Sequence, residues 1–490
     1  MLAEYMAPIM FAGLVIFLLI GYPVAFSLAF TGLAFGYLGI QLGMLQPVLL
    51  QALPERVLGI MGNSVLLAIP FFTLMGLILE RSGMAEDLLD TIGQVFGSIR
   101  GGIAYAVVFV GALLAATTGV VAASVLAMGL ISLPVMMRYG YSNRLSTGVI
   151  AASGTLAQII PPSLVLIVLA DQMGVSVGDM YEGALFPGLG LAAAYAVWVF
   201  IVSMVKPHAA PGCPPEMRTM RGRKLFMGVL TSMLPPLILI FLVLGTIFIG
   251  VATPTEGGAM GATGALIMAL VKRKLSWSLL KQAVESTATM TSFVMFILIG
   301  STVFSLVFRG VDGDLWVERL LLHVPGGALG FLIVVNVIIF LLAFFLDYFE
   351  IAFIMVPLLT PVAQKLGIDL IWFGVLLAVN MQTSFLHPPF GFALFYLRSV
   401  APKSVKTSDI YWGAIPFVVI QVLMVAAVIA FPNLVTGNVT EAATVKGTGE
   451  DELRRQLGLP APGAEQAPPG GEQKSDDTAS EIEKALRGGK

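Results

Sequence analysis

The chain has 490 residues, of which 57% are hydrophobic and 11% are charged. Soluble domains carry about 25% charged residues, so this sequence has too few polar side chains to cover a surface that faces water. The 27 Lys and Arg residues are balanced by 29 Asp and Glu residues, which excludes a basic surface for nucleic acid. One cysteine and three scattered histidines exclude a disulfide framework and a zinc cluster. The composition predicts an integral membrane protein.

Long stretches without charged residues mark the predicted membrane spans. A helix needs about 20 apolar residues to cross a bilayer. The first stretch is long enough for two spans with a turn at Gly21-Tyr22-Pro23, and its start lacks the basic region of a cleaved signal peptide. The stretches lie between Glu4 and Glu55, Arg100 and Arg138, Arg144 and Asp171, Glu182 and Lys206, Lys224 and Glu256, Glu285 and Arg309, Arg319 and Asp347, Asp369 and Arg398, and Asp409 and Glu441.

The second of these stretches is too long for one helix. Residues 101–137 contain no charge, and Thr117, Thr118 and Gly119 lie near the middle of the stretch. Small residues of this kind suit a turn. We therefore predict a re-entrant hairpin with its tip at these three residues.

Two prolines interrupt the next apolar stretch. Pro161 and Pro162 follow Ser153, Gly154 and Thr155, and each proline removes a backbone donor and clashes with the preceding turn. Unwound backbone at membrane depth is tolerated where it is buried in protein or lines a wet cavity. Hydroxyl and amide oxygens suit a hard cation such as sodium, and a freed helix N-terminus suits a carboxylate. The alternative is a plain proline kink packed by neighbouring helices.

The second half of the chain repeats these features. Several ordered matches at one offset indicate two copies, residues 1–205 and 225–431, joined by a linker, 206–224. Residues 432–490 form a predicted disordered charged tail. At an offset of 227, Gly83 recurs as Gly310, Asp87 as Asp314, Pro134 as Pro361, Gly140 as Gly367, and Pro161-Pro162 as Pro388-Pro389, while Asp179 to Ala184 resembles Asp409 to Ala414 at an offset of 230.

The counterpart of the first hairpin contains two acidic residues, Asp347 and Glu350. Inserting a charged group into the middle of a membrane span costs at least about 2.5–3.5 kcal/mol of free energy. These carboxylates are therefore expected at a binding site or near a water-filled vestibule. Their three-residue spacing places both on one face if the segment is helical. The alternative is that they lie at the membrane surface where the hairpin turns.

Basic residues near span ends favour the cytoplasmic side. If the linker is cytoplasmic and each copy has five crossings plus one hairpin, 16 basic residues fall inside and four outside, with seven in the tail. The opposite orientation reverses this ratio. Five crossings per copy make the second copy inverted relative to the first, with both termini periplasmic. The four outside residues are Arg56, Arg309, Arg319 and Lys365.

Two further polar residues have competing interpretations. Glu256 follows Thr253 by three residues, a spacing typical of a helix cap, and the other interpretation is a binding role. His387 precedes the second double proline, where it is either a packing residue, which we favour, or a proton relay.

Together these motifs resemble the large membrane subunit, DctM-like, of tripartite ATP-independent periplasmic (TRAP) transporters within the ion transporter superfamily. The resemblance covers about residues 1–432. It depends on residues 152–155 (ASGT) followed by 160–163 (IPPS), on 252–256 (ATPTE), and on 380–383 (NMQT) followed by 388–391 (PPFG). The tip of the first hairpin, Thr117-Thr118-Gly119, differs from the Ser-Gly-Ser-Ser type that many relatives have.

The resemblance implies a fold and a set of ligands. The expected fold is an all-α polytopic membrane protein of two inverted repeats with discontinuous helices, in which a transport domain moves like an elevator against a scaffold. Na⁺ is the coupling ion, with no other cofactor. The implied sodium and substrate residues are Thr117, Thr118, Gly119, Ser153, Gly154, Thr155, Asp347, Asn380, Gln382 and Thr383, with the helix breaks at Pro161, Pro162, Pro388 and Pro389 and with Glu350 and Glu256 as further candidates.

The resemblance also implies partners and a location. A small four-helix membrane subunit and a periplasmic substrate-binding protein complete a sodium-coupled importer of small organic acids in the bacterial inner membrane. The run 390–396 (FGFALFY) resembles the branch linked with monocarboxylates and 2-oxo acids. The alternative function is a stand-alone ion-coupled organic anion symporter. An enzyme is not expected, because the spans lack a paired-aspartate, Ser/His or metal-ligand arrangement.

Overall fold

The computed structural model describes residues 2–119, 121–212, 220, 222–344, 346–389, 391–437 and 439, and it describes side chains from residue 5 on except those of residues 85, 117 and 118. Every regular element in these ranges is an α-helix or a 3-10 turn, which confirms the all-α class. Six helices are long and apolar enough to cross a membrane. Gly313–Leu322 and Gly327–Leu342, bent by 116° relative to one another, form a seventh candidate.

The first half of the chain contains eleven of the described α-helices. The turn predicted at Gly21 separates the first two. The elements are α1 (Leu2–Ile20), α2 (Val24–Gln41), α3 (Val48–Gln51), α4 (Leu53–Met61), α5 (Ala68–Arg81), α6 (Met84–Phe96), α7 (Gly102–Thr118), α8 (Val121–Arg138), α9 (Asn143–Thr155), the 3-10 turn η1 (Leu156–Gln158), α10 (Leu164–Met173) and α11 (Val177–Val205).

The second half begins after the linker, which contains the 3-10 turn η2 (Pro207–Ala209). Its elements are α12 (Arg223–Phe248), α13 (Pro254–Val271), α14 (Trp277–Gly310), α15 (Gly313–Leu322), α16 (Gly327–Leu342), α17 (Tyr348–Ile354), α18 (Val356–Lys365), α19 (Leu370–Met381), the 3-10 turn η4 (Gln382–Phe385), α20 (Phe392–Val400), α21 (Thr407–Ala430) and α22 (Asn433–Thr436). Helix α22 lies within the predicted tail, and its Val435 is buried. Residues 440–490 lie outside the described residues.

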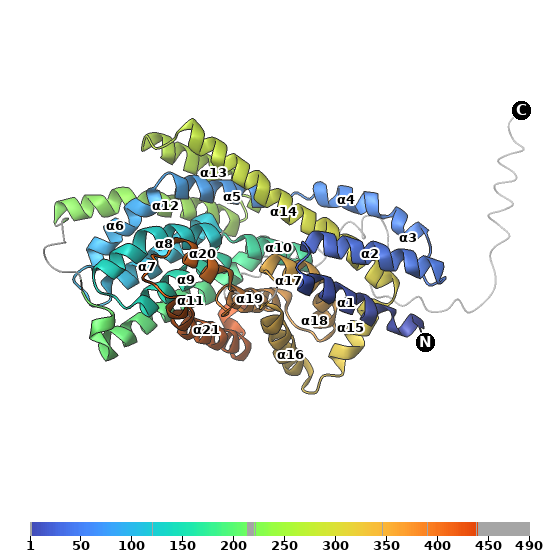
Figure 1. Cartoon of the computed structure of the whole chain (residues 1–490). Coiled ribbons are helices and arrows are strands. Elements are labelled where there is room, and N and C mark those ends of the chain that lie inside the picture. Colours follow the sequence, from blue (N-terminus) through green and yellow to red (C-terminus); the bar gives the residue numbers. More distant parts are fainter. Residues whose placement is uncertain are drawn as a thin grey trace, which may run out of the picture. The chain divides into compact units, whose positions relative to one another are not determined.

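The order of helices in the second half repeats the order in the first. At the offset of 227, α1 corresponds to α12, α2 to α13, α5 to the second part of α14, and the series α6 to α11 to the series α15 to α21. Helix α13 packs along α5, and its counterpart α2 packs along α14, the counterpart of α5 (Figure 1). Each of these contacts between a helix of the first copy and a helix of the second copy therefore has a counterpart in which the two copies take the opposite roles.

Glycines at close helix crossings form equivalent contacts in the same way. Gly413 of α21 lies against the backbone of Arg144 at the start of α9, and Gly183 of α11 lies against Ile371 at the start of α19. These contacts are equivalent, because 183 corresponds to 413 and 144 to 371 at the two offsets of the repeat. Gly148 of α9 packs directly on the Gly413 carbonyl, so that neither glycine has room for a Cβ atom.

The helix in each copy is interrupted at the double proline. Helix α9 tightens into η1, and a non-helical stretch with Pro161-Pro162 precedes α10. Helix α19 tightens into η4, and a non-helical stretch with Pro388-Pro389 precedes α20. Both double prolines contain a cis peptide bond. Helix α10 contacts α19 and α17, which brings the two interrupted regions together in the middle of Figure 1.

The two predicted hairpins differ in their turns. Helices α7 and α8 meet at Gly119, whose φ of 60° is a left-handed conformation that glycine adopts without a Cβ clash. In the second copy α16 leads into residues 343–347, and the returning arm is divided into α17 and α18. Asp347 is the residue that starts α17, as its N-cap.

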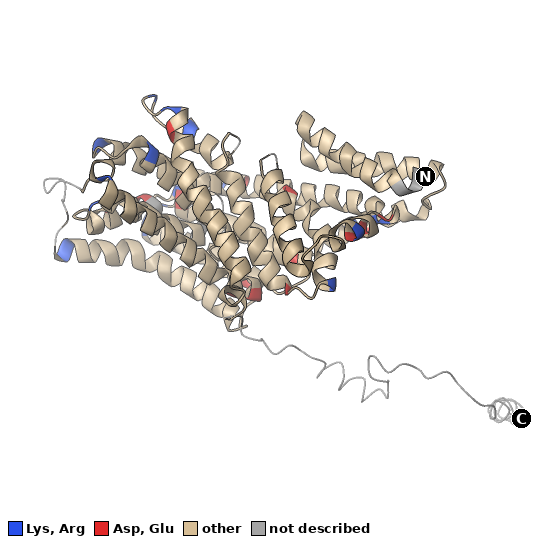
Figure 2. Cartoon of the chain, turned by 90° about the horizontal axis from the view of Figure 1, so that it is seen from below, with Lys and Arg blue, Asp and Glu red and all other residues tan. Residues whose placement is uncertain are grey.

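Charged side chains lie mainly toward the ends of the helices. Figure 2 shows most Lys and Arg residues of the described part toward one end and fewer toward the other. Some of them form ion pairs: Lys274 Nζ lies 2.8 Å from Asp87 Oδ2, and Arg144 Nε lies 3.4 Å from Asp409 Oδ1. Lys365 Nζ lies 2.6 Å from a carboxylate oxygen of α15.

Candidate functional site

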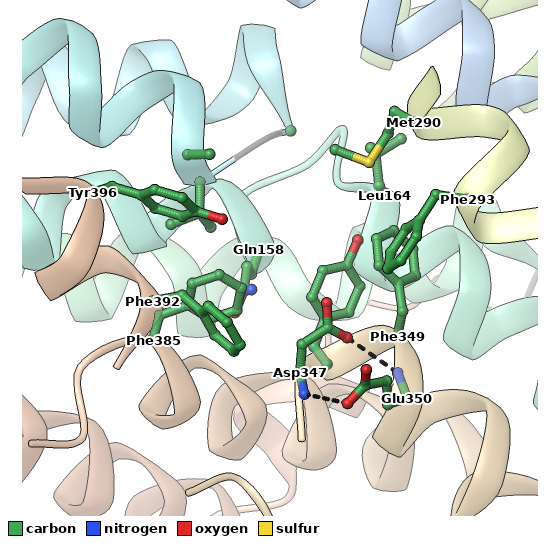
Figure 3. A pocket seen from close by; sticks show the side chains of 14 residues that line it. Gln158, Leu164, Met290, Phe293, Asp347, Phe349, Glu350, Phe385, Phe392 and Tyr396 are labelled. Carbon is green, nitrogen blue, oxygen red and sulfur yellow. Dashed lines mark hydrogen bonds between the residues drawn. The ribbon is translucent and has the colours of Figure 1, made fainter. Parts of the chain in front are cut away.

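One cavity, with a volume of about 340 Å³, lies between the two hairpins and the two interruptions (Figure 3). Ligand pockets have a similar character, with mostly apolar walls and a few polar groups. The wall consists of Gly119, Val121 and Ala122 from the first hairpin, Gln158 and Leu164 from the first interruption, Asp347, Tyr348, Phe349 and Glu350 from the second hairpin, Phe385 and Phe392 from the second interruption, Met290 and Phe293 from α14, and Tyr396 from α20.

Asp347 and Glu350 hold one another at the start of α17. The Glu350 backbone N–H donates to Asp347 Oδ1 over 3.1 Å, and the Asp347 backbone N–H donates to Glu350 Oε2 over 2.9 Å (Figure 3). This reciprocal pair is a capping box, which satisfies two backbone donors that the first helical turn leaves unpaired. Asp347 therefore precedes the helix instead of sharing a helical face with Glu350, and both carboxylates line the cavity.

Glu350 also lines a neighbouring cavity of about 580 Å³. This second cavity lies between the turn that joins α1 and α2 and the middle of α14, and it shares Phe293 and Glu350 with the first. The Phe293 and Phe349 rings stand edge to face, with centroids 6.4 Å apart. Glu350 and Phe293 therefore lie where the two cavities border one another.

The predicted tip of the first hairpin reaches the cavity at Gly119. Thr117 and Thr118 form the last turn of α7, and their side chains lie outside the described part. The position of a Cβ atom on Gly119 would be 3.4 Å from Leu164 of the first interruption. The hairpin tip thus packs directly on the interrupted segment of its own copy.

The three predicted residues of the first interruption are completely buried at the end of α9. Thr155 Oγ1 donates to the Ala152 carbonyl over 2.8 Å. Ser153 Oγ has no hydrogen-bond partner among the described residues. Gly154 packs against Val125 of α8. None of the three belongs to the cavity wall.

The predicted residues of the second interruption are also buried and hydrogen-bonded. Asn380 Nδ2 donates to the backbone oxygen of Asn336 over 2.8 Å, and Thr383 Oγ1 donates to the Asn380 carbonyl over 2.6 Å. Gln382 Nε2 donates to the Thr155 carbonyl over 3.0 Å. Positions 155 and 382 are equivalent at the repeat offset, so matched residues of the two interruptions touch directly.

Glu256 lies away from this site. It is exposed and forms a capping box with Thr253 at the start of α13, with Thr253 N–H donating to Glu256 Oε2 over 2.8 Å and Glu256 N–H donating to Thr253 Oγ1 over 3.3 Å. The neighbouring Thr255 hydroxyl donates to the Ser64 carbonyl over 2.6 Å. Of the two interpretations of Glu256, the structure favours the cap.

Gln158 is a cavity residue that the sequence analysis did not select. It ends η1, is 1% exposed and lines the cavity, and neither of its side-chain polar atoms has a partner among the described residues. Its position at the end of an interrupted helix was the available signal. What the sequence lacked was any indication that this amide, and not the hydroxyls before it, faces the cavity.

His387 lies between two rings of the second hairpin arm. Its centroid is 4.2 Å from that of Phe340 and 4.3 Å from that of Phe344, with the second pair stacked. Neither imidazole nitrogen has a hydrogen-bond partner among the described residues. Within the part of the chain that the structure describes, the contacts of His387 are therefore packing contacts with these two rings.

Comparison with known proteins gives consistent findings. Residues 11–434 match the model of the family described as tripartite ATP-independent periplasmic transporter, DctM component. The chain is 31% identical to the C4-dicarboxylate TRAP transporter large permease protein DctM of Pseudomonas aeruginosa, over 75% of this chain and 84% of that protein. It is 28% identical to the isethionate TRAP transporter permease protein DctMQ of Oleidesulfovibrio alaskensis, over 89% and 67% of the two chains.

One solved structure has a similar fold. The YdaH transporter of Alcanivorax borkumensis superposes on the chain with a TM-score of 0.56, at 15% identity, over 79% of this chain and 88% of the other. At this identity the likeness concerns the fold alone.

Proposed function

Because the chain belongs to the DctM family of TRAP transporters, whose members are transport proteins and not enzymes, we propose that it is the large permease subunit of a sodium-coupled secondary transporter. It imports small organic acids, with monocarboxylates and 2-oxo acids as the favoured class. It works with a small four-helix membrane subunit and a periplasmic substrate-binding protein. Na⁺ is the coupling ion, and no other cofactor takes part.

The observation that carries this proposal is the convergence of both hairpins and both interruptions on one cavity with two carboxylates. An acid bound beside Asp347 meets a like charge, and two unit charges about 4 Å apart repel by about 4 kcal/mol at an effective dielectric constant near 20. A sodium ion bound to the same carboxylate removes this repulsion. The acid then binds well only with the ion, which is the thermodynamic requirement for coupled transport.

Two kinds of observation support the proposed sodium ligands. Gly119 and Asp347 belong to the cavity wall. Outside the wall, Ser153 Oγ and Gln382 Oε1 are buried oxygens without a partner among the described residues, and hard cations prefer oxygen ligands. The full set that we propose is Thr117, Thr118, Gly119, Ser153, Gly154, Thr155, Asp347, Asn380, Gln382 and Thr383.

We further propose that the two copies are inverted repeats, with both termini in the periplasm. The exchange of equivalent contacts between the copies supports a two-fold relation. The segregation of basic residues in Figure 2 supports a cytoplasmic location for that end. In an elevator mechanism, the hairpins and interrupted helices form the transport domain and move together, and the hydrogen bond from Gln382 to the Thr155 carbonyl joins the two interrupted helices.

The alternative function is a stand-alone ion-coupled organic anion symporter of the same superfamily. Uptake experiments distinguish the two. The chain is reconstituted in liposomes with or without the small subunit, and radiolabelled organic acids are supplied with the binding protein under an inward sodium gradient. We expect uptake only when sodium and both partners are present. Uptake by the chain alone contradicts the dependence on partners, and equal uptake with potassium in place of sodium contradicts the sodium coupling.

A further inference from the structure

The two copies contribute opposite chemistry to matched positions of the cavity wall. Gln158 is the last residue of η1, and Phe385 is the last residue of η4. They are 227 residues apart, which makes them equivalent in the repeat, and both line the cavity. The first copy therefore offers an amide where the second copy offers an aromatic ring.

The amide of Gln158 lacks partners in the described part of the chain. Its side chain is 1% exposed, and neither Nε2 nor Oε1 is hydrogen-bonded. Figure 3 shows it among the residues that surround the cavity. Buried polar side-chain atoms are normally paired, so an unpaired amide facing a cavity points to a polar group of a ligand.

Much of the cavity wall is aromatic. The rings of Phe385 and Phe392 have centroids 6.0 Å apart, and the edge-to-face pair of Phe293 and Phe349 follows along the wall. Aromatic and aliphatic walls gain free energy by covering the apolar surface of a ligand. A carboxylate placed against these rings loses its hydration without gaining a hydrogen bond.

The charges of the wall disfavour a second negative charge on the ligand. Asp347 and Glu350 line the cavity, and none of the described residues in its wall is Lys, Arg or His. Every negative charge of the ligand must therefore be matched by a cation that enters with it. A single carboxylate needs the fewest such cations, and a volume of about 340 Å³ suits a small ligand.

We propose, on the premise of the sodium-coupled acid transport proposed above, that this cavity selects a monocarboxylic acid with an apolar body and that Gln158 determines this specificity. Gln158 Nε2 donates to a carboxylate oxygen of the acid. The apolar body lies against Phe385 and Phe392. A dicarboxylate fits poorly, because its second carboxylate adds another negative charge beside Asp347 and Glu350.

The test measures direct binding, so that selection by the periplasmic protein does not enter. The full chain, purified with its small membrane subunit in lipid nanodiscs, is titrated in sodium buffer with 4-methyl-2-oxopentanoate and with succinate. We expect the monocarboxylate to bind at least tenfold more tightly. Succinate binding as tightly or more tightly overturns the proposed specificity.

Two substitutions test the residues. Gln158→Leu removes the amide at nearly constant volume, and we expect at least tenfold weaker binding of 4-methyl-2-oxopentanoate. Phe385→Gln gives the second copy the amide of the first, and we expect the preference over succinate to fall at least fivefold. Gln364→Leu, at an exposed position of α18 outside the cavity, is the matched control and should change binding less than twofold.

The outcomes separate this inference from the proposed function. Binding by Gln158→Leu within twofold of the unmodified chain overturns the role of Gln158. If Gln158→Leu does not elute as a monodisperse complex, Gln158→Asn keeps an amide but shortens it, and unchanged affinity in that variant has the same meaning. If binding depends on sodium but succinate binds more tightly than 4-methyl-2-oxopentanoate, the proposed specificity is wrong and the proposal of sodium-coupled acid transport is unaffected. Absence of sodium-dependent binding of either acid contradicts both.

Discussion

At Asp347 one side chain both caps helix α17 and lines the cavity, and a single substitution separates the two roles. Asn is as good an N-cap as Asp, so Asp347→Asn keeps the hydrogen bond to the Glu350 backbone and removes only the charge. If the carboxylate binds sodium, we expect the half-saturating sodium concentration for uptake to rise at least tenfold, with thermal stability nearly unchanged. Uptake rates measured over a series of sodium concentrations check this.

Glu256 is the control for that experiment, because it is also an acidic residue of a capping box, at the place that Glu350 holds in the box of Asp347. It is exposed and lies outside the cavity wall. Glu256→Gln retains an acceptor for the Thr253 backbone N–H, so we expect the sodium dependence to change less than twofold. Equal loss in the Asp347 and Glu256 variants, or loss in neither, contradicts the assignment of Asp347 to the sodium site.

At the scale of helices, the crossing of α9 and α21 provides a direct test of close packing. Gly148 lies on the backbone carbonyl of Gly413, where a Cβ atom has no room. Gly148→Ala forces the two helices apart, and overpacking of this kind costs about 1–3 kcal/mol. We expect a lower midpoint of thermal unfolding for the purified complex in detergent.

The control for this crossing is Gly245→Ala in α12. Gly245 lies in the last turn of α12 with no atom near the position of a Cβ, so alanine there should stabilise the helix, by at most about 0.5–1 kcal/mol, through its higher helix propensity. The two glycine substitutions should therefore shift the midpoint in opposite directions. A Gly148 variant as stable as the unmodified chain contradicts the close crossing.

The sequence predicted the first hairpin turn because its cause is local, whereas the helix interruptions needed the repeat as well, since Pro235-Pro236 lies inside the continuous helix α12. Proline lacks a backbone donor wherever it stands, and Gly119 adopts a left-handed φ that other residues avoid. The capping box at Asp347 was also local, since an acidic residue followed by Glu three positions later is its pattern, but the two carboxylates were interpreted as a helical face. The direction of the Gln158 amide was not predictable, because it depends on packing between segments far apart in sequence.

At the scale of the whole molecule, contacts between equivalent residues of the two copies restrict how the copies are arranged. Gln382 donates to the backbone of Thr155, the equivalent residue of the other copy. In a two-fold arrangement, equivalent residues contact one another only close to the axis. In the inverted arrangement proposed above, the interruptions therefore lie close to the axis, and residues of both copies line the cavity. This explains why residues of a single copy could not define the site.

Inversion of the copies predicts that equivalent residues lie on opposite sides of the membrane. Arg138 ends α8 and Lys365 ends α18, they are 227 residues apart, and both are exposed. Because Cys213 is the only cysteine, a Cys213→Ser chain is a clean background for single cysteines at these positions. We expect a membrane-impermeant maleimide to label Lys365→Cys in intact cells and Arg138→Cys only after the inner membrane is permeabilised. Labelling of both from the same side means that the copies are parallel, and it rules out the proposed topology.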